Sequence, residues 1–132
     1  MPPFSRHFLG SAPSVTEARR FVTALLGRSP MAQTAELIVS ELATNAIHHT
    51  ASGRFGGRFI VTVQAQPKRA WLAVVDEGGL STPKCFRPSL EGEGGRGLFL
   101  VSELSADWGI WGDENGRTVW ATLIAGREMP WT

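Results

Sequence analysis

Residues 58–76, RFIVTVQAQPKRAWLAVVD, carry the pattern that decides the fold class. In the first half, Phe59, Val61 and Val63 alternate with polar residues, and a second apolar run follows the break at Pro67-Lys68. An alternation with a period of two is typical of a strand, and a short break between two such runs indicates an antiparallel hairpin. We therefore expect two neighbouring strands, at residues 58–66 and 69–76.

Helical and strand patterns flank this hairpin on both sides. Apolar residues recur at helical spacing in two stretches before it and in one stretch after it, and two more strand patterns follow. Ser14 and Glu17, three residues apart, form a capping box that predicts the start of the first helix. The expected order is strand 4–9, helix 15–26, helix 31–49, strands 58–66 and 69–76, helix 97–104, and strands 108–111 and 117–124.

This order of elements predicts the architecture. Neighbouring strands joined by hairpins favour a mixed, mostly antiparallel sheet, and the helices then cover one of its faces. The predicted fold class is α/β (α+β), a two-layer sandwich. A chain of 132 residues buries about two thirds of its unfolded surface, so we expect a single domain over residues 1–132.

Composition excludes several classes of protein. The formal net charge is +1 and the basic residues are scattered, so direct binding of nucleic acid is not expected. The longest apolar runs, such as 71–75, are far shorter than the roughly 20 residues of a membrane-spanning helix, and the first residues do not form a secretory signal. Cys85 is the single cysteine, which excludes an internal disulfide and fits a cytoplasmic protein.

Glycines gather in one region of the chain. Six of the fifteen lie between Gly78 and Gly97. Residues 77–94 lack periodicity and form a long loop, and loops of this length in a small domain are commonly functional lids. This loop begins just after a strand-end aspartate, Asp76, and finishes at the start of helix 97–104.

Polar residues on helix 31–49 form the first candidate site. Glu41, Asn45 and His48 fall within about 60° of one another around the helix. The simpler interpretation is a solvated helix face. The functional interpretation is that the Asn45 oxygen binds a hard divalent cation, while the Glu41 carboxylate takes a proton from a nucleophile.

Two further candidates flank the long loop. Asp76 is followed by Gly78 and Gly79, a common strand exit, where a carboxylate could also accept a hydrogen bond from an exocyclic amine such as adenine N6. Residues 92–97, GEGGRG, precede a helix, so their backbone amides are suited to phosphates. They match Gly-x-Gly-x-x-Gly, but they follow a proline-containing loop instead of a strand, so a dinucleotide-binding fold is not expected.

Taken in order, Glu41-x-x-x-Asn45, Asp76-x-Gly78 and Gly95-x-Gly97 resemble the nucleotide-binding boxes of the GHKL (Bergerat-fold) ATPase superfamily. Residues 41–47, 94–98 and 116–120 resemble one branch of it, the bacterial anti-sigma-factor serine kinases and related small ATP-binding regulators. One position departs from the usual Asp-x-Gly-x-Gly pattern, because Leu80 stands where the second glycine is expected.

The resemblance implies ATP and Mg²⁺ as ligands and an ATP lid over residues 79–94. It implies that Asn45 holds Mg²⁺, that Asp76 reads the adenine amine and that Glu41 is the general base. Thr118 would line the floor of the nucleotide site. The complete nucleotide-binding set that it implies is Asn45, Asp76, Gly78, Gly95, Arg96, Gly97, Leu98 and Thr118.

The resemblance also implies partners. A kinase of this branch would phosphorylate an anti-anti-sigma (STAS) protein and regulate a sigma factor. Two alternatives stay open: a non-catalytic ATP-sensing adaptor of the same fold, and a structural α/β domain in which the three boxes coincide by chance. An exposed edge strand would permit a homodimer.

Overall fold

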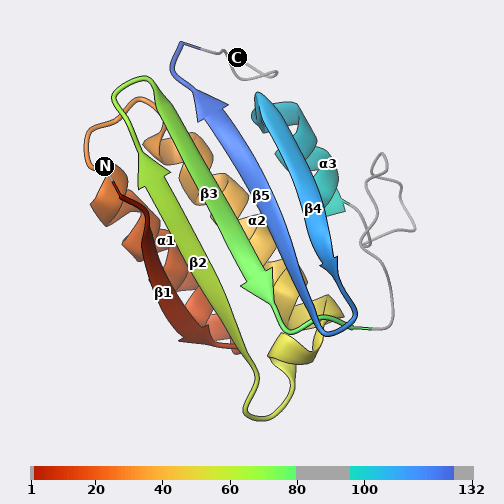
Figure 1. Cartoon of the computed structure of the whole chain (residues 1–132). Helices are drawn as coiled ribbons and strands as arrows, with labels where there is room; N and C mark the ends of the chain where they lie inside the picture. Colours follow the sequence, from red (N-terminus) through yellow and green to blue (C-terminus); the bar gives the residue numbers. More distant parts are fainter. Residues whose placement is uncertain (1, 80–95, 127–132) are drawn as a thin grey trace.

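The computed structural model describes residues 2–79 and 96–126 (Figure 1). The predicted order of helices and strands is confirmed, and a short 3-10 helix, η1, adds to it. The elements are β1 (Phe4–Leu9), α1 (Ala12–Leu26), α2 (Ala32–His49), η1 (Ala51–Gly53), β2 (Arg58–Ala65), β3 (Arg69–Asp76), α3 (Arg96–Leu104), β4 (Asp107–Asp113) and β5 (Gly116–Ile124). Of the predicted lid, only Gly79 falls within the described residues.

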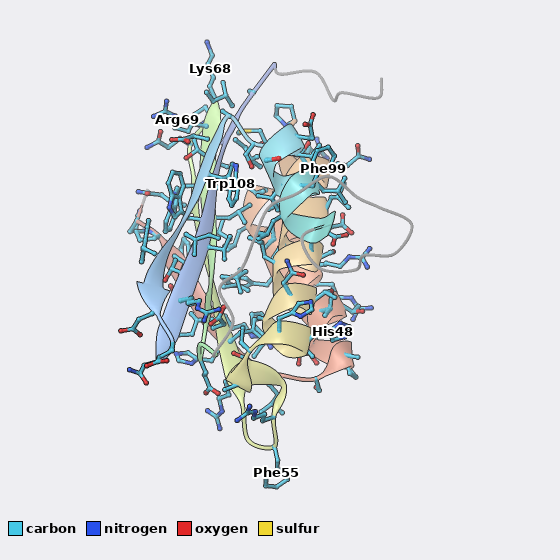
Figure 2. All side chains as sticks on the ribbon, turned by 90° about the vertical axis from the view of Figure 1, so that its right-hand side faces the viewer. His48, Phe55, Lys68, Arg69, Phe99 and Trp108 are labelled. Atoms are coloured by element: carbon cyan, nitrogen blue, oxygen red, sulfur yellow. The ribbon has the colours of Figure 1, made fainter. Side chains whose placement is uncertain are left out.

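The strands form one sheet in the order β1-β2-β3-β5-β4, and each neighbouring pair is antiparallel. All three α-helices lie behind the same face of this sheet in Figure 1. Seen at a right angle in Figure 2, the sheet and the helices form two layers. The predicted two-layer sandwich is therefore confirmed, with an antiparallel sheet instead of a mixed one.

The hydrophobic core fills the space between the two layers. Along β5, buried residues alternate with partly exposed ones, so every second side chain packs against the helices. In the core, the ring of Phe59 stacks on that of Phe8 at 5.4 Å between centroids. Burial of apolar surface contributes about 25 cal/mol per Å². Because most of the buried apolar side chains lie between the sheet and the helices, the contact between these two layers is the main source of stability. No helix in the described part of the chain has the length and apolar character needed to span a membrane.

The start of α1 differs from the prediction. The helix begins at Ala12 with Ser11 as its N-cap, and Pro13 lies in the first turn. Ser14 is inside the helix and buried, so the capping box of Ser14 and Glu17 was wrong. The first turn tolerates proline because its amides have no partner within the helix.

Candidate nucleotide-binding site

Asp76 ends β3 on the face of the sheet that the helices cover. Its side chain is 7% exposed, and Oδ1 accepts a hydrogen bond from the Gly78 backbone N–H at 2.6 Å. Gly78 has a φ of 78°, in the left-handed region that glycine adopts without strain. The chain therefore turns sharply straight after Asp76 and folds back onto its carboxylate.

Hydrogen bonds from two neighbouring elements hold the strand exit, which is the backbone of residues 77–79 after β3. From η1, the Ala51 N–H donates to the Gly78 carbonyl at 2.8 Å, and the buried Ser52 hydroxyl accepts from the Glu77 N–H at 2.9 Å. From β5, the Arg117 guanidinium donates to the Gly79 carbonyl. The backbone that follows Asp76 is thus fixed between η1 and β5.

The environment of Asp76 acts on its ionisation. Burial raises the pKa of Asp76 above its ordinary value of 3.8. The Gly78 N–H, the positive charge of Arg117 and the Arg117 N–H each stabilise the carboxylate and oppose this rise in pKa. A buried carboxyl with a perturbed pKa at a strand end is a candidate for a functional group.

A second group of predicted site residues lies where α2 meets α3. A Cβ built on Gly97 would lie 2.9 Å from Glu41 Oε2 and 3.1 Å from Asn45 Nδ2. Both side chains therefore reach the same point in the first turn of α3, which only a glycine leaves free. The first turn of a helix presents unpaired N–H groups and the positive end of the helix dipole, so it favours an anion. The third residue predicted on this face of the helix, His48, is exposed (Figure 2).

The donor atoms at this point suit a hard divalent cation. Glu41 and Asn45 supply a carboxylate and an amide oxygen, the ligands that Mg²⁺ takes in proteins. No group of three or more His, Cys, Asp or Glu side chains that could hold a metal ion occurs among residues 2–79 and 96–126. Mg²⁺ needs no such group, because in nucleotide sites it takes most of its ligands from phosphate and water.

A comparison with known families identifies the domain. The sequence profile of the histidine kinase-like ATPase domain matches residues 10–123, which is most of the chain. The chain belongs to this family. The family implies that the domain binds ATP, and the predicted superfamily is confirmed.

Two further comparisons concern single proteins. The ATPase domain matches a solved structure of the RsbU and RsbW domains of Rv1364c from Mycobacterium tuberculosis with a TM-score of 0.70 and 15% identity. The match covers 94% of this chain and 32% of that chain, so this chain spans about a third of the solved one. At this identity the likeness shows a common fold. No curated protein matches the chain.

Thr118 does not lie on the face of the sheet where it was predicted. Thr118 pairs with Val75, and Arg117 pairs with Asp76, so Thr118 lies on the uncovered face of the sheet while Arg117 shares the face of Asp76. The prediction that Thr118 lines the nucleotide site was therefore wrong by one residue. Successive side chains of a strand point to opposite faces, so this shift moves the residue across the sheet.

The other predicted site residues fall into two groups. The structure brings Glu41, Asn45 and Gly97 together, and Gly78 and Asp76 together. Leu98 is 3% exposed and packs in the hydrophobic core, so its predicted contact with the nucleotide stays a prediction. Gly95 and the side chain of Arg96 lie outside the described residues, so their predicted contacts with phosphate stay predictions.

Arg117 and Ser52 were not predicted from the sequence. Side chains alternate between the two faces of β5, and Arg117 lies on the same face as the core residues Val119 and Ala121. This alternation would have placed Arg117 on the helix-covered face, where Asp76 lies. Ser52 gave no such signal, because its role depends on η1 lying against the end of β3.

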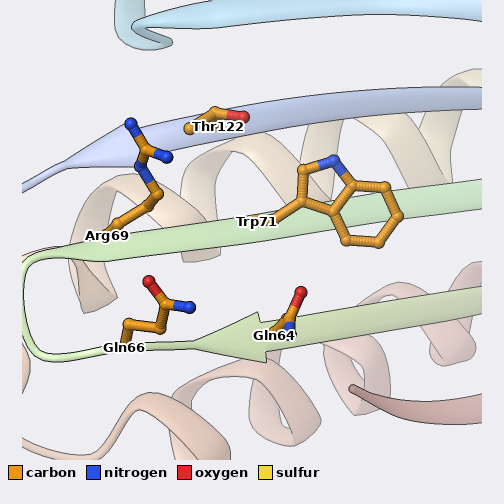
Figure 3. Close-up of a pocket in the computed structure, with 5 residues that line it drawn as sticks. All are labelled: Gln64, Gln66, Arg69, Trp71 and Thr122. Atoms are coloured by element: carbon orange, nitrogen blue, oxygen red, sulfur yellow. The ribbon is translucent and has the colours of Figure 1, made fainter. Parts of the chain in front are cut away.

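A separate hollow lies on the uncovered face of the sheet (Figure 3). It is lined by Gln64, Gln66, Arg69, Trp71 and Thr122. Trp71 pairs with Gln64 on one side and Thr122 on the other, and none of these residues shares the face of Asp76. The hollow is therefore distinct from the nucleotide site of the ATPase domain.

Proposed function

We propose that the protein is a cytoplasmic serine kinase that uses ATP to phosphorylate an anti-anti-sigma (STAS) protein and thereby regulates a sigma factor. The observation that carries the proposal is the meeting of Glu41 and Asn45 at Gly97, in the first turn of α3. A carboxylate, an amide oxygen and free backbone amides at one point are the groups that phosphoryl transfer requires.

Each of these groups has one task. Asp76 accepts a hydrogen bond from the exocyclic amine of adenine and so orients the nucleotide. The backbone amides of the first turn of α3 bind phosphate oxygens. Glu41 takes the proton of the attacking serine hydroxyl as the serine oxygen bonds to the γ-phosphorus, and the bond from that phosphorus to the bridging β–γ oxygen breaks to release ADP.

Asn45 would hold Mg²⁺, with Glu41 beside it. When bound, Mg²⁺ neutralises the negative charge that the phosphate groups carry during transfer. Because transfer depends mainly on position and charge, one base and one metal ligand of the chain are sufficient for this chemistry.

Incubation with γ-labelled ATP and a STAS domain encoded near the gene tests the proposal. We expect label on the STAS protein. The Glu41→Gln variant should bind ATP with unchanged affinity and transfer no label, because the amide keeps the shape of the side chain without its basicity. Transfer at the wild-type rate by this variant would remove Glu41 as the base.

The same assay separates kinase from adaptor. A protein that binds ATP with Mg²⁺, captures the STAS domain or the sigma factor in the presence of a non-hydrolysable analogue, and transfers no label is the ATP-sensing adaptor. In that case the binding groups keep their assignment and the role of Glu41 as a base is refuted.

A further inference from the structure

Arg117 is a buried arginine that none of the proposed steps uses. It is the second residue of β5, and its side chain is 6% exposed. Arginine is rarely buried to this extent unless its charge is compensated. Its position beside the proposed adenine-reading carboxylate therefore points to a role in the site.

Arg117 acts on Asp76 and on the backbone that follows it. The register of β3 and β5 places the two residues directly opposite each other on the helix-covered face. The Arg117 backbone N–H donates to the Asp76 carboxylate, and its positive charge stabilises that carboxylate. The guanidinium itself donates to the carbonyl of Gly79, so the same side chain also holds the strand exit.

Other charged groups near Asp76 are less well placed to do this. Burial favours the protonated form of Asp76, and the cation that opposes it in the described part of the chain is Arg117. The titratable side chains towards this end of the neighbouring elements are Glu41, His48 and His49 on α2, Arg54 after η1, Arg58 on β2, Glu77 after β3, Asp113 on β4 and Glu114 after it. Of these, all except the half-buried Glu41 are exposed. Water screens exposed charges, whereas the buried charge of Arg117 acts with little screening.

We propose that Arg117 is the positioning residue for the Asp76 carboxylate and so sets the preference for a nucleoside triphosphate whose base carries an exocyclic amine. The inference rests on the proposed role of Asp76 in reading adenine. An ionised carboxylate only accepts hydrogen bonds, so it pairs with the amine of adenine. A protonated carboxyl also donates, and it would pair with the carbonyl oxygen that hypoxanthine carries at the same position.

Calorimetric titration with ATP and with inosine triphosphate, at about pH 6 and about pH 8, tests this role. The wild type should prefer ATP at both pH values. Arg117→Gln keeps a hydrogen-bond donor but loses the charge, so its preference for ATP should fall about tenfold at the lower pH and by less at the higher one. Arg117→Lys keeps the charge and should keep the preference. The control is Arg69→Met, an exposed arginine at the other end of β3, which should match the wild type.

The outcomes separate this inference from the proposed function. If Arg117→Gln keeps the wild-type preference for ATP over inosine triphosphate, the proposed role of Arg117 is overturned. An equal loss of affinity for both nucleotides at both pH values also overturns it, because a purely structural residue would have that effect. If Arg117→Gln does not fold, loss of the preference in a folded Arg117→Lys overturns it. A wild type that binds neither nucleotide refutes the proposed ATP site itself.

Discussion

Replacing Gly97 with alanine should impair nucleotide binding and phosphoryl transfer without unfolding the domain. The added Cβ would lie 2.9 Å from Glu41 Oε2 and 3.1 Å from Asn45 Nδ2, against 3.4–4 Å for an ordinary contact. Both side chains would therefore have to retreat by about half an ångström. These two side chains are the proposed base and the proposed metal ligand. Their displacement would relieve the steric strain of the added Cβ, but it would move both groups out of their positions in the proposed site.

The magnitudes separate the effect on function from the effect on stability. Alanine is favoured over glycine in a helix by up to about 1 kcal/mol, which offsets the strain, so the free energy of unfolding should change by less than about 1 kcal/mol. A misplacement of about 1 Å can lower the rate of a reaction about 100-fold. A shift of half that size should lower the transfer rate about tenfold.

Urea unfolding measures the stability of Gly97→Ala, and titration with ATP and Mg²⁺ and transfer of labelled phosphate measure its function. Gly116→Ala is the matched control, because its added Cβ would meet only the Asp76 carbonyl oxygen at 3.6 Å and its φ is not positive. We expect the control to match the wild type. Wild-type affinity and transfer in Gly97→Ala would refute the inferred closeness of α3 to Glu41 and Asn45.

Four other variants test particular contacts. As the pH rises above 3.8, the free energy of unfolding of the wild type should fall relative to that of Asp76→Asn. The reason is that the raised pKa of Asp76 makes the folded protein hold the proton more tightly than the unfolded chain does. Urea unfolding at several pH values measures this difference between the two proteins, and a difference that stays constant with pH would contradict the prediction. Asp76→Asn should also lose affinity for ATP, as titration would show. Phe59→Ala should cost about 3–5 kcal/mol in chemical denaturation, because it empties a buried site stacked on Phe8. Thr118→Ala should leave ATP affinity unchanged, since Thr118 lies on the uncovered face, and a clear loss would restore it to the site. Asn45→Ala should bind ATP equally with and without Mg²⁺, and a persisting effect of Mg²⁺ on its affinity would move the metal ligand elsewhere.

Local patterns were sufficient for most of the fold. The alternation in residues 58–66 and the helical spacing in 31–49 each reflect one buried face, so they could be recognised without knowing which element covers them. The start of α1 could not be predicted from the capping box, because the N-cap is Ser11, three residues before Ser14, and Pro13 is accommodated in the first turn. The short helix η1 has too few residues for any period to appear.

The sequence by itself determined the fold class and the order of elements, which follow from spacing along single helices and strands. Its resemblance to the GHKL superfamily also predicted the groups that we propose meet a nucleotide: Glu41, Asn45, Asp76 and Gly78. Only the tertiary structure decided that Arg117, and not Thr118, pairs with Asp76 across the sheet. It also decided that the Ser52 hydroxyl accepts a hydrogen bond from the Glu77 N–H at the end of β3. The physical reason is that register between strands is set by pairing across the sheet, and a shift of one residue exchanges the two faces.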